Sequence, residues 1–278
     1  MELIKRFKKN VKGRDFFVGD IHGTFNLLEY EMERISFDKN IDRLFCTGDL
    51  FNRGSHEHLI KNFVNKKWFF NCIGNHDDNF LSVYNIEKND YRVISNEVTL
   101  KNRMEKTYNF LKELTISDLD EIIKHLNQSS IMMQVETDLG LIGLIHAEIP
   151  AYKSWNESIS FFESKEKETN LYREYAFWGD RIYQRPRDIE FLFESIFLTR
   201  KDIKNLVSKT AKDLHILYMG HNIVPSSIED DHSYQELCKC TTNTNHLKFI
   251  DHGAFLKQTG VNKKSYGTFI YDVNGCMI

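Results

Sequence analysis

Short apolar runs that end in glycine followed by Asp or Asn recur along this chain, and they constrain its fold more than any other feature. Residues 16–18 lead into Gly19 and Asp20, and residues 44–47 lead into Gly48 and Asp49. A third run, 68–73, ends at Gly74 and Asn75. Apolar residues at helical spacing lie between these runs. This β-α-β-α-β order predicts a parallel sheet with helices packed on it.

Later runs repeat the pattern. A hairpin is predicted over 131–136 and 141–146 and ends at His146, and a strand over 216–219 leads to His221. Further strands are predicted at 247–250 and 266–273. The intervening segments, about 78–130 and 150–212, have helical spacing and high polarity. We therefore expect an α/β fold with mixed sheets flanked by helices, in one domain spanning 1–278 with two helical cap insertions.

Composition narrows the functional classes. The chain has 278 residues, of which 41% are hydrophobic, enough for a sizeable core. The formal net charge of −3 makes a nucleic-acid partner an unfavoured interpretation. No stretch approaches the roughly 20 apolar residues that cross a bilayer, and five cysteines suit reduced thiols, so a cytoplasmic protein without membrane association is expected. The basic segment 5–14 is expected to be a solvated arm.

The polar residues that end the apolar runs form a coherent ligand set. The carboxyl ends of parallel strands meet at one edge of a sheet, where open α/β sheets place their sites. Carboxylate, imidazole and amide groups suit divalent manganese, iron or zinc, and one carboxylate, Asp49, is able to bridge two ions. Taken singly, each residue also fits a turn or a hydrogen-bonded strand end. The candidate metal ligands are Asp20, His22, Asp49, Asn75, His146 and His221.

The motifs around these residues resemble those of the phosphoprotein phosphatase family of metallophosphoesterases, in particular its compact bacterial and bacteriophage branch. They are GDIHG at 19–23, GDLFNRG at 48–54, GNHD at 74–77, HAEIP at 146–150 and GHNIVP at 220–225, with IDHGAF at 250–255 also similar. The resemblance implies the metallophosphoesterase fold and two divalent ions, with manganese expected and iron or zinc as alternatives.

The resemblance also implies roles for individual residues. Asp20, His22 and Asp49 would hold the first ion, and Asp49, Asn75, His146 and His221 the second. His76 would be the general acid that protonates the leaving oxygen. Arg53 would bind the phosphate, since its planar fork suits bidentate contact with phosphate oxygens. Arg181 would be a second phosphate-binding arginine, with a salt bridge to Asp180 or Glu174 as the structural alternative.

These roles predict a phosphomonoesterase for phosphoserine and phosphothreonine in proteins, with phosphotyrosine as a further substrate, in which water between the ions attacks phosphorus directly. Its partner is a phosphoprotein or a phosphorylated small molecule. The alternative is a symmetrical diadenosine tetraphosphatase or another nucleotide phosphoesterase. A metal-binding module without catalysis is a third interpretation, disfavoured because all six ligand positions hold competent residues.

One position departs from the family pattern. The usual carboxylate partner of the acid histidine falls at position 52, which is Asn in this chain. A neutral amide cannot supply the Coulomb attraction that raises an imidazole pKa. Either Asp77 or Asp78 takes over this role, or His76 is a weaker reservoir of acid at neutral pH. Related enzymes that cleave dinucleoside polyphosphates also lack this Asp.

One further histidine, His252, is expected near the site.

Overall fold

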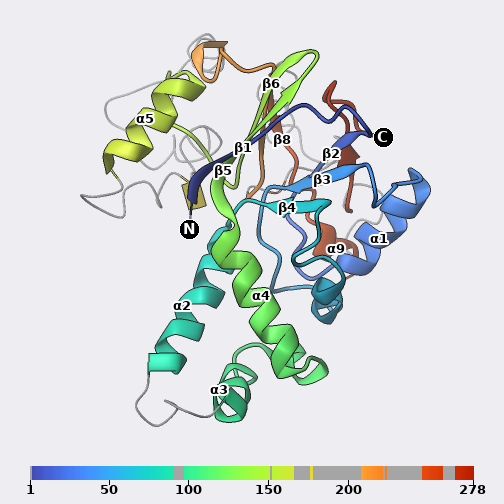
Figure 1. The fold of residues 1–278 in the computed structure, drawn as a ribbon, viewed down its shortest axis with the longest axis vertical. Coiled ribbons are helices and arrows are strands. Elements are labelled where there is room, and N and C mark those ends of the chain that lie inside the picture. The colour runs from blue at the N-terminus through green and yellow to red at the C-terminus, as the bar shows by residue number, and fades with distance from the viewer. Residues whose placement is uncertain are drawn as a thin grey trace, which may run out of the picture.

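Two mixed β-sheets pack face to face in the computed structural model, with helices on their outer sides (Figure 1). The four-stranded sheet has the order β4-β3-β2-β9, and the five-stranded sheet has the order β1-β5-β6-β7-β8. The strands are β1 (Glu2–Phe7), β2 (Asp15–Val18), β3 (Arg43–Cys46), β4 (Phe69–Asn71), β5 (Ser130–Thr137), β6 (Gly140–Ile145), β7 (Ile216–Met219), β8 (Leu247–Phe249) and β9 (Ile270–Tyr271). The predicted fold class is confirmed. The structure describes residues 2–89, 97–150, 152–165, 176–177, 208–221, 223, 246–258 and 267–278.

A buried aromatic layer joins the two sheets. Phe17 of β2 stacks on Tyr218 of β7, with ring centroids 4.6 Å apart, and on Phe45 of β3 at 5.6 Å. All three side chains are fully buried. Strands covered on both faces need apolar residues at every position, which explains the continuous apolar runs in the sequence. The stacking also fixes the ends of β2 and β7 relative to each other, although they belong to different sheets.

The segment 78–130 is helical where it is described, as predicted. It contains α2 (Asn75–Asn89), α3 (Glu97–Met104), the 3₁₀ helix η2 (Asn109–Glu113) and α4 (Ile116–Gln128), which project together away from the sheets (Figure 1). Thr115 caps α4 in a capping box with Asp118. The single-domain organisation and the capping role of this segment stay predictions.

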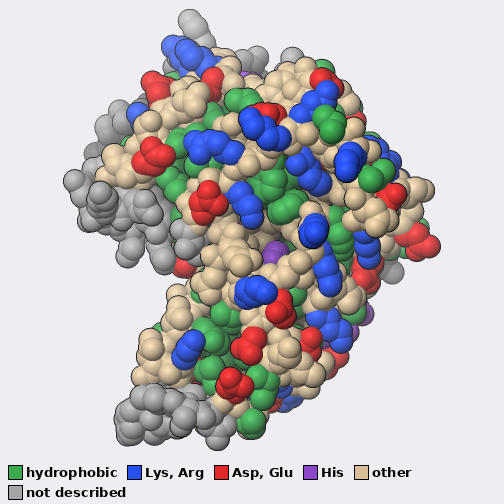
Figure 2. Space-filling model, in the orientation of Figure 1, with side chains coloured by type: hydrophobic (Ala, Val, Ile, Leu, Met, Phe, Trp, Pro, Cys, Tyr) green, Lys and Arg blue, Asp and Glu red, His purple; other side chains and the backbone are tan. Residues whose placement is uncertain are grey.

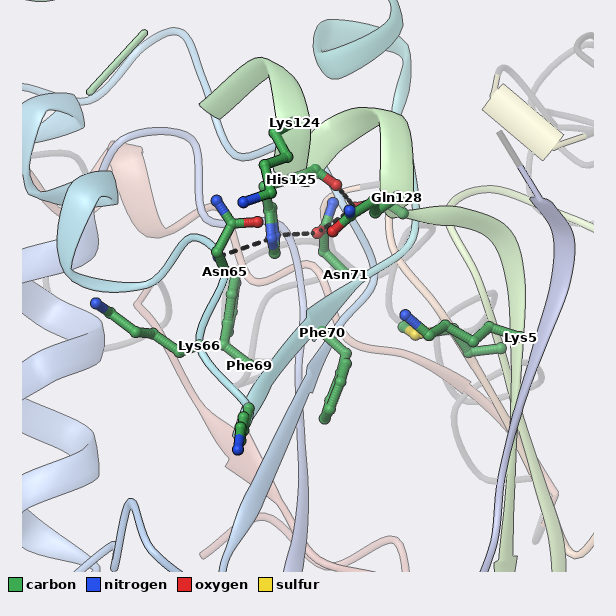
Figure 3. Close-up of a pocket in the computed structure, with 12 residues that line it drawn as sticks. Lys5, Asn65, Lys66, Phe69, Phe70, Asn71, Lys124, His125 and Gln128 are labelled. Atoms are coloured by element: carbon green, nitrogen blue, oxygen red, sulfur yellow. Dashed lines mark hydrogen bonds between the residues drawn. The ribbon is translucent and has the colours of Figure 1, made fainter. Parts of the chain in front are cut away.

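A polar network fastens α4 to β4 (Figure 3). The backbone N–H of Asn65 donates to His125 Nδ1 over 3.0 Å, so the opposite nitrogen, Nε2, carries the proton and donates to Asn71 Oδ1 at 2.8 Å. Ser129 Oγ also donates to Asn71 Oδ1, at 2.9 Å. The network lies in the wall of a cavity of about 310 Å³. It holds the end of β4, from which α2 begins, against the insertion.

The second predicted insertion, 150–212, is described only in part. It contains α5 (Trp155–Lys165), whose buried Trp155 donates from Nε1 to Gln134 Oε1 of β5 at 3.0 Å. Arg181 and its alternative partners Asp180 and Glu174 lie outside the described residues. The remaining described helices are α1 (Phe25–Arg34), η1 (Glu57–Asn62) and α9 (Ala254–Gln258). No helix among the described residues is long and apolar enough to span a membrane.

The prediction of a solvated N-terminal arm is wrong for its first residues. Glu2–Phe7 forms β1, an edge strand parallel to β5, with Ile4 buried. Lys8 and Lys9 then form exposed ion pairs with Glu136 and Asp138. Lys and Arg side chains are scattered over the face of the molecule that carries β1 (Figure 2). Charged side chains are common on edge strands, where they disfavour pairing with another chain, and here they hide the strand signal in the sequence.

Candidate metal centre

Six strands from both sheets point their carboxyl ends at one edge of the sandwich. The strands β2, β3 and β4 run parallel to one another, and so do β6, β7 and β8. The loops that follow them bring together all predicted site residues within the described part of the chain. Asp20, His22, Asp49 and His146 are buried, Asn75, His76 and His221 are half-buried, and Arg53 is exposed. Arg181 lies outside the described residues.

His22 is oriented for metal binding by the loop after β3. Its Nδ1 lies 3.0 Å from the carbonyl oxygen of Phe51, which can only accept a hydrogen bond, so Nδ1 carries the proton. This leaves a lone pair on Nε2, which lies 3.5 Å from Asp49 Oδ2. A backbone carbonyl that fixes the tautomer of a ligand histidine is common around metal sites.

The carboxylate of Asp49 lies between two groups of candidate ligands. Its Oδ2 faces His22, whereas its Oδ1 lies 3.6 Å from His146 Nε2. On the far side, Asn75 Oδ1 lies 3.0 Å from His146 Nε2 and 3.1 Å from His221 Nδ1. With one oxygen toward each group, the carboxylate is placed to bridge two ions.

The donor set fits divalent ions. Possible ligand atoms of Asp49, His146 and His221 lie within 4.8 Å of one another, as do those of His22, Asp49 and His76. The donors are nitrogen and oxygen without thiolate, which suits manganese, iron or zinc. Asp20 forms a third such group, with His22 and Asp251. The predicted ligands thus have the chemistry for divalent ions, and their assignment to two ions stays a prediction.

The buried carboxylates of this cluster lack enough neighbouring positive charge. Burial raises the pKa of Asp20 and Asp49, and the neighbouring carboxylates Asp251 and Asp77 raise it further. Burial, with the nearby Arg53 charge, lowers the pKa of His22 to about 3. The imidazole is therefore neutral at pH 7, which is the form that binds metals. Crowded carboxylates next to neutral imidazoles favour the binding of cations.

Several site residues adopt strained backbone conformations. The φ angles of four of them lie in the left-handed region, which residues other than glycine rarely occupy. They are 46° for His22, 50° for Asp49, 64° for His221 and 82° for Arg53. Such strain costs about 1–3 kcal/mol per residue and persists where the surroundings enforce it, often at functional sites. With Asn52, at 68°, the site contains five of the nine non-glycine residues with positive φ in the described part of the chain.

Asn52 lies beside His76, at the position that the family resemblance implied for the partner of the acid. Its Nδ2 lies 2.8 Å from His76 Nδ1. The two oxygens of Asp77 accept the backbone N–H groups of Leu50 at 2.8 Å and Gly74 at 3.1 Å. Burial and the Arg53 charge lower the pKa of His76 to about 4. The described contacts thus give this imidazole an amide partner.

Arg53 extends over the mouth of the site. Its Nη1 lies 3.2 Å from His22 Nε2, and its Nη2 lies 3.4 Å from His76 Nε2. Its guanidinium also stacks on Phe255 of α9, 4.8 Å from the ring centroid. An exposed guanidinium between a candidate ligand and the candidate acid is well placed to bind phosphate oxygens.

Sequence reasoning missed two residues of this region. Asp251 is fully buried next to Asp20 and His22, and Phe255 contacts Arg53. Asp251 carried a usable signal, because it follows an apolar run as the other acidic candidates do. His252, which was expected near the site, has its Nε2 2.6 Å from the Tyr271 hydroxyl in the core.

We predict that Gly220→Ala weakens metal binding. A Cβ at Gly220 would lie 2.0 Å from Asp20 Oδ1, so the carboxylate would have to move. We expect manganese affinity, measured by calorimetry on metal-free protein, to fall by about 10–100-fold, as for disturbed ligand surroundings. Gly267→Ala is the control, because its Cβ would make an ordinary 3.4 Å contact with Phe269. Equal affinity in the two variants would refute this account of Gly220.

We also predict that His76 and Asp49 separate catalysis from metal binding. His76→Ala keeps the backbone N–H that donates to Asp49 Oδ1 at 2.9 Å, so metal content should be unchanged. Turnover of alkyl phosphates should fall by roughly 10²–10⁴-fold, the usual contribution of a general acid. Asp49→Ala should instead lose metal, measured by elemental analysis. Loss of metal from the His76 variant would contradict this division of roles.

Comparisons with known proteins identify the family of this chain. Residues 16–253 match the model of the calcineurin-like phosphoesterase family. A symmetrical bis(5′-nucleosyl)-tetraphosphatase of Buchnera aphidicola is 29% identical over 69% of this chain and 63% of its own length. One of Hamiltonella defensa is 25% identical over 91% of this chain and 87% of its own. Serine/threonine-protein phosphatase 2 of Salmonella typhimurium is 27% identical over 54% of this chain and 66% of its own.

The chain thus spans less than two thirds of the Buchnera and Salmonella relatives. A solved structure assigned provisionally as a diadenosine tetraphosphatase has the same fold, with a TM-score of 0.51 and 16% identity over 100% of this chain and 97% of that chain. From the family match over most of its length, the chain belongs to the calcineurin-like phosphoesterase family, and its described residues include groups of His and Asp that could hold a metal ion.

Proposed function

We propose that this phosphoesterase cleaves a dinucleoside tetraphosphate symmetrically, at the central anhydride, and releases two nucleoside diphosphates. The observation that carries the proposal is the amide of Asn52 beside His76, at the position where a carboxylate would support a strong acid. The names of the Buchnera and Hamiltonella relatives support the same substrate class. This ranks the nucleotide alternative above the protein phosphatase activity predicted first from the sequence.

The nature of the leaving group explains why the amide of Asn52 is a sufficient partner for the acid His76. Water adds its oxygen to one of the two central phosphorus atoms, the bond from that phosphorus to the bridging oxygen breaks, and this oxygen departs on a nucleoside diphosphate. The last pKa of a terminal phosphate is near 6, so the group leaves as a stable anion with little need for a proton. A serine alkoxide is far more basic and depends on general acid catalysis. A neutral partner for His76 is therefore better suited to an anhydride.

The residues of the site would have three roles: metal binding, phosphate binding and protonation of the leaving oxygen. Asp20, His22 and Asp49 would hold one ion, and Asp49, Asn75, His146 and His221 the other. Bound ions would supply Lewis-acid charge to the phosphate oxygens and activate water. Arg53 binds non-bridging oxygens with its two terminal nitrogens. His76, oriented by Asn52, faces the leaving oxygen from its Nε2.

A phosphoprotein is the second candidate substrate. The Salmonella relative is named as a serine/threonine-protein phosphatase, and the guanidinium of Arg53 is exposed enough to meet a phosphate on a protein surface. The candidate ligands would serve both substrates equally, so only the need for a proton on the leaving group separates them.

Product analysis tests the proposal. The protein loaded with manganese is incubated with diadenosine tetraphosphate, with phosphoserine, phosphothreonine and phosphotyrosine peptides, and with p-nitrophenyl phosphate. We expect ADP as the sole nucleotide product and a higher kcat/KM for the tetraphosphate than for any peptide. ATP with AMP would show cleavage at another bond, and faster release of phosphate from a peptide would favour the second candidate. Either result would reject the proposal.

Chelation should abolish activity, and manganese should restore it better than magnesium. Magnesium prefers octahedral sites built mostly from oxygen, whereas three imidazoles are among the six predicted ligands. The measurement is initial rate against added metal after confirmed removal by chelator. Full activity in metal-free protein would contradict a metal-dependent mechanism.

Asn52→Asp should convert the site toward substrates with poor leaving groups. A carboxylate at this position attracts the imidazolium and raises the pKa of His76, so the acid form persists to higher pH. We expect kcat for phosphoserine peptides to rise more than kcat for diadenosine tetraphosphate or p-nitrophenyl phosphate, with the alkaline limb of the pH–rate profile moved upward.

Asn109→Asp, an exposed substitution with the same change in charge, is the control for this experiment and should leave all three rates unchanged. Metal content is checked in each preparation. Equal changes for the three substrates, with an unmoved alkaline limb, would show that Asn52 does not control the acid.

A further inference from the structure

Asp251 is a buried carboxylate with an unused oxygen. It follows β8 and has no solvent exposure. Its Oδ1 accepts the backbone N–H of Gly253 at 2.8 Å, whereas its Oδ2 is buried and has no hydrogen-bond partner among the residues that the structure describes. A buried carboxylate oxygen without a partner is costly and calls for an explanation such as a bound ion.

The fold places Asp251 next to the candidate metal centre. The chain before Asp251 runs so close to β2 that a Cβ on Gly19 would lie 2.0 Å from the carbonyl oxygen of Ile250. Possible ligand atoms of Asp20, His22 and Asp251 lie within 4.8 Å of one another. Two ligand atoms bound to one ion at about 2.0–2.2 Å are separated by at most about 4.4 Å. A small inward movement therefore places all three around a common ion.

The ligand count of the two ions points to the same residue. The predicted set gives the second ion Asp49 and three further ligands, but gives the first ion only two besides Asp49. Two divalent ions carry four positive charges, whereas the predicted set contains only two carboxylates, Asp20 and Asp49. Asp251 would complete four protein ligands at the first ion and add a third negative charge.

We propose that Asp251 is a seventh protein ligand of the metal centre and binds the first ion through Oδ2, together with Asp20 and His22. The inference rests on the two-ion centre of the proposed function and adds a ligand beyond the set predicted from the sequence. Asp251 holds the turn at Gly253 through one oxygen and reaches the ion with the other. The loop after β8 thereby joins the loop after β2 at the metal.

The variant Asp251→Asn tests the proposal, because an amide keeps the shape and the acceptor for Gly253 but loses the charge. Manganese binding to metal-free protein is measured by calorimetry. We expect two ions in the wild type, and in the variant a dissociation constant raised at least about tenfold for one ion and unchanged for the other. Electron paramagnetic resonance should then show a lone manganese ion where the wild type shows a coupled pair.

Asp272→Asn is the matched control. Asp272 also accepts backbone N–H groups at a turn, those of Asn274 and Cys276 at 2.9 Å each, and it is not among the candidate ligands. Its variant should bind both ions as the wild type does. Two ions bound with wild-type affinities in the Asp251 variant would overturn the inference and leave the proposed centre intact. A wild type that binds no pair of ions would reject the centre itself, and the inference with it.

Thermal unfolding separates a ligand from a merely structural residue. Removing an unpaired buried charge should raise the Tm of the metal-free protein, whereas losing a ligand should reduce the rise in Tm that manganese produces. A structural role alone would lower Tm equally with and without manganese, and that result would overturn the proposal.

A crystal structure of the wild type with manganese provides a measurement that does not depend on the folding of the variant. An Asp251 oxygen within about 2.5 Å of the first ion is expected, and an ion without that contact would overturn the proposal.

Discussion

Backbone N–H groups that donate to buried aspartates hold the site together. The N–H of His221 donates to Asp20 Oδ2 at 2.8 Å, and the N–H of His76 donates to Asp49 Oδ1 at 2.9 Å. Each bond connects the loop after one strand with the loop after another, and the first of them crosses between the two sheets. Because a buried carboxylate without such partners costs several kcal/mol, an Asp at a strand end also determines which loop must meet it.

These hydrogen bonds do not offset the negative charge of the clustered carboxylates. The pKa of Asp20 and that of Asp49 remain raised by burial and by neighbouring carboxylates, even though each accepts a backbone N–H. The left-handed φ angles of His22 and His221 add local strain. The cluster is thus unfavourable without cations, and part of the binding energy of the ions would appear as stability of the folded chain.

Much of the site could be predicted from the sequence, because the period of the apolar runs fixes the strands and the strand direction fixes where each loop emerges. This reasoning brought Asp20, Asn75 and His146 together across two sheets. It missed β1, whose lysines and arginines hide its edge position, and the contact of Phe255 with Arg53, which depends on the path of a loop. Asp251 fitted the strand-end pattern, but its ligand role was not sought, since the family resemblance already supplied a complete set of six ligands.

The choice of substrate depends on a finer feature than the fold. Family members named for dinucleoside tetraphosphates and for phosphoproteins share the match to this chain, and metal ligands alone would serve both. The two substrate classes differ in how strongly the leaving oxygen depends on protonation. The partner of His76 is therefore the feature that distinguishes them. Asn52 and Asp differ by a single group at that position, NH₂ in place of O⁻, yet only the carboxylate stabilises the imidazolium. An amide there supports the departure of an alkoxide less than a carboxylate would, whereas an anhydride needs little such support. We therefore propose a nucleotide as the substrate class.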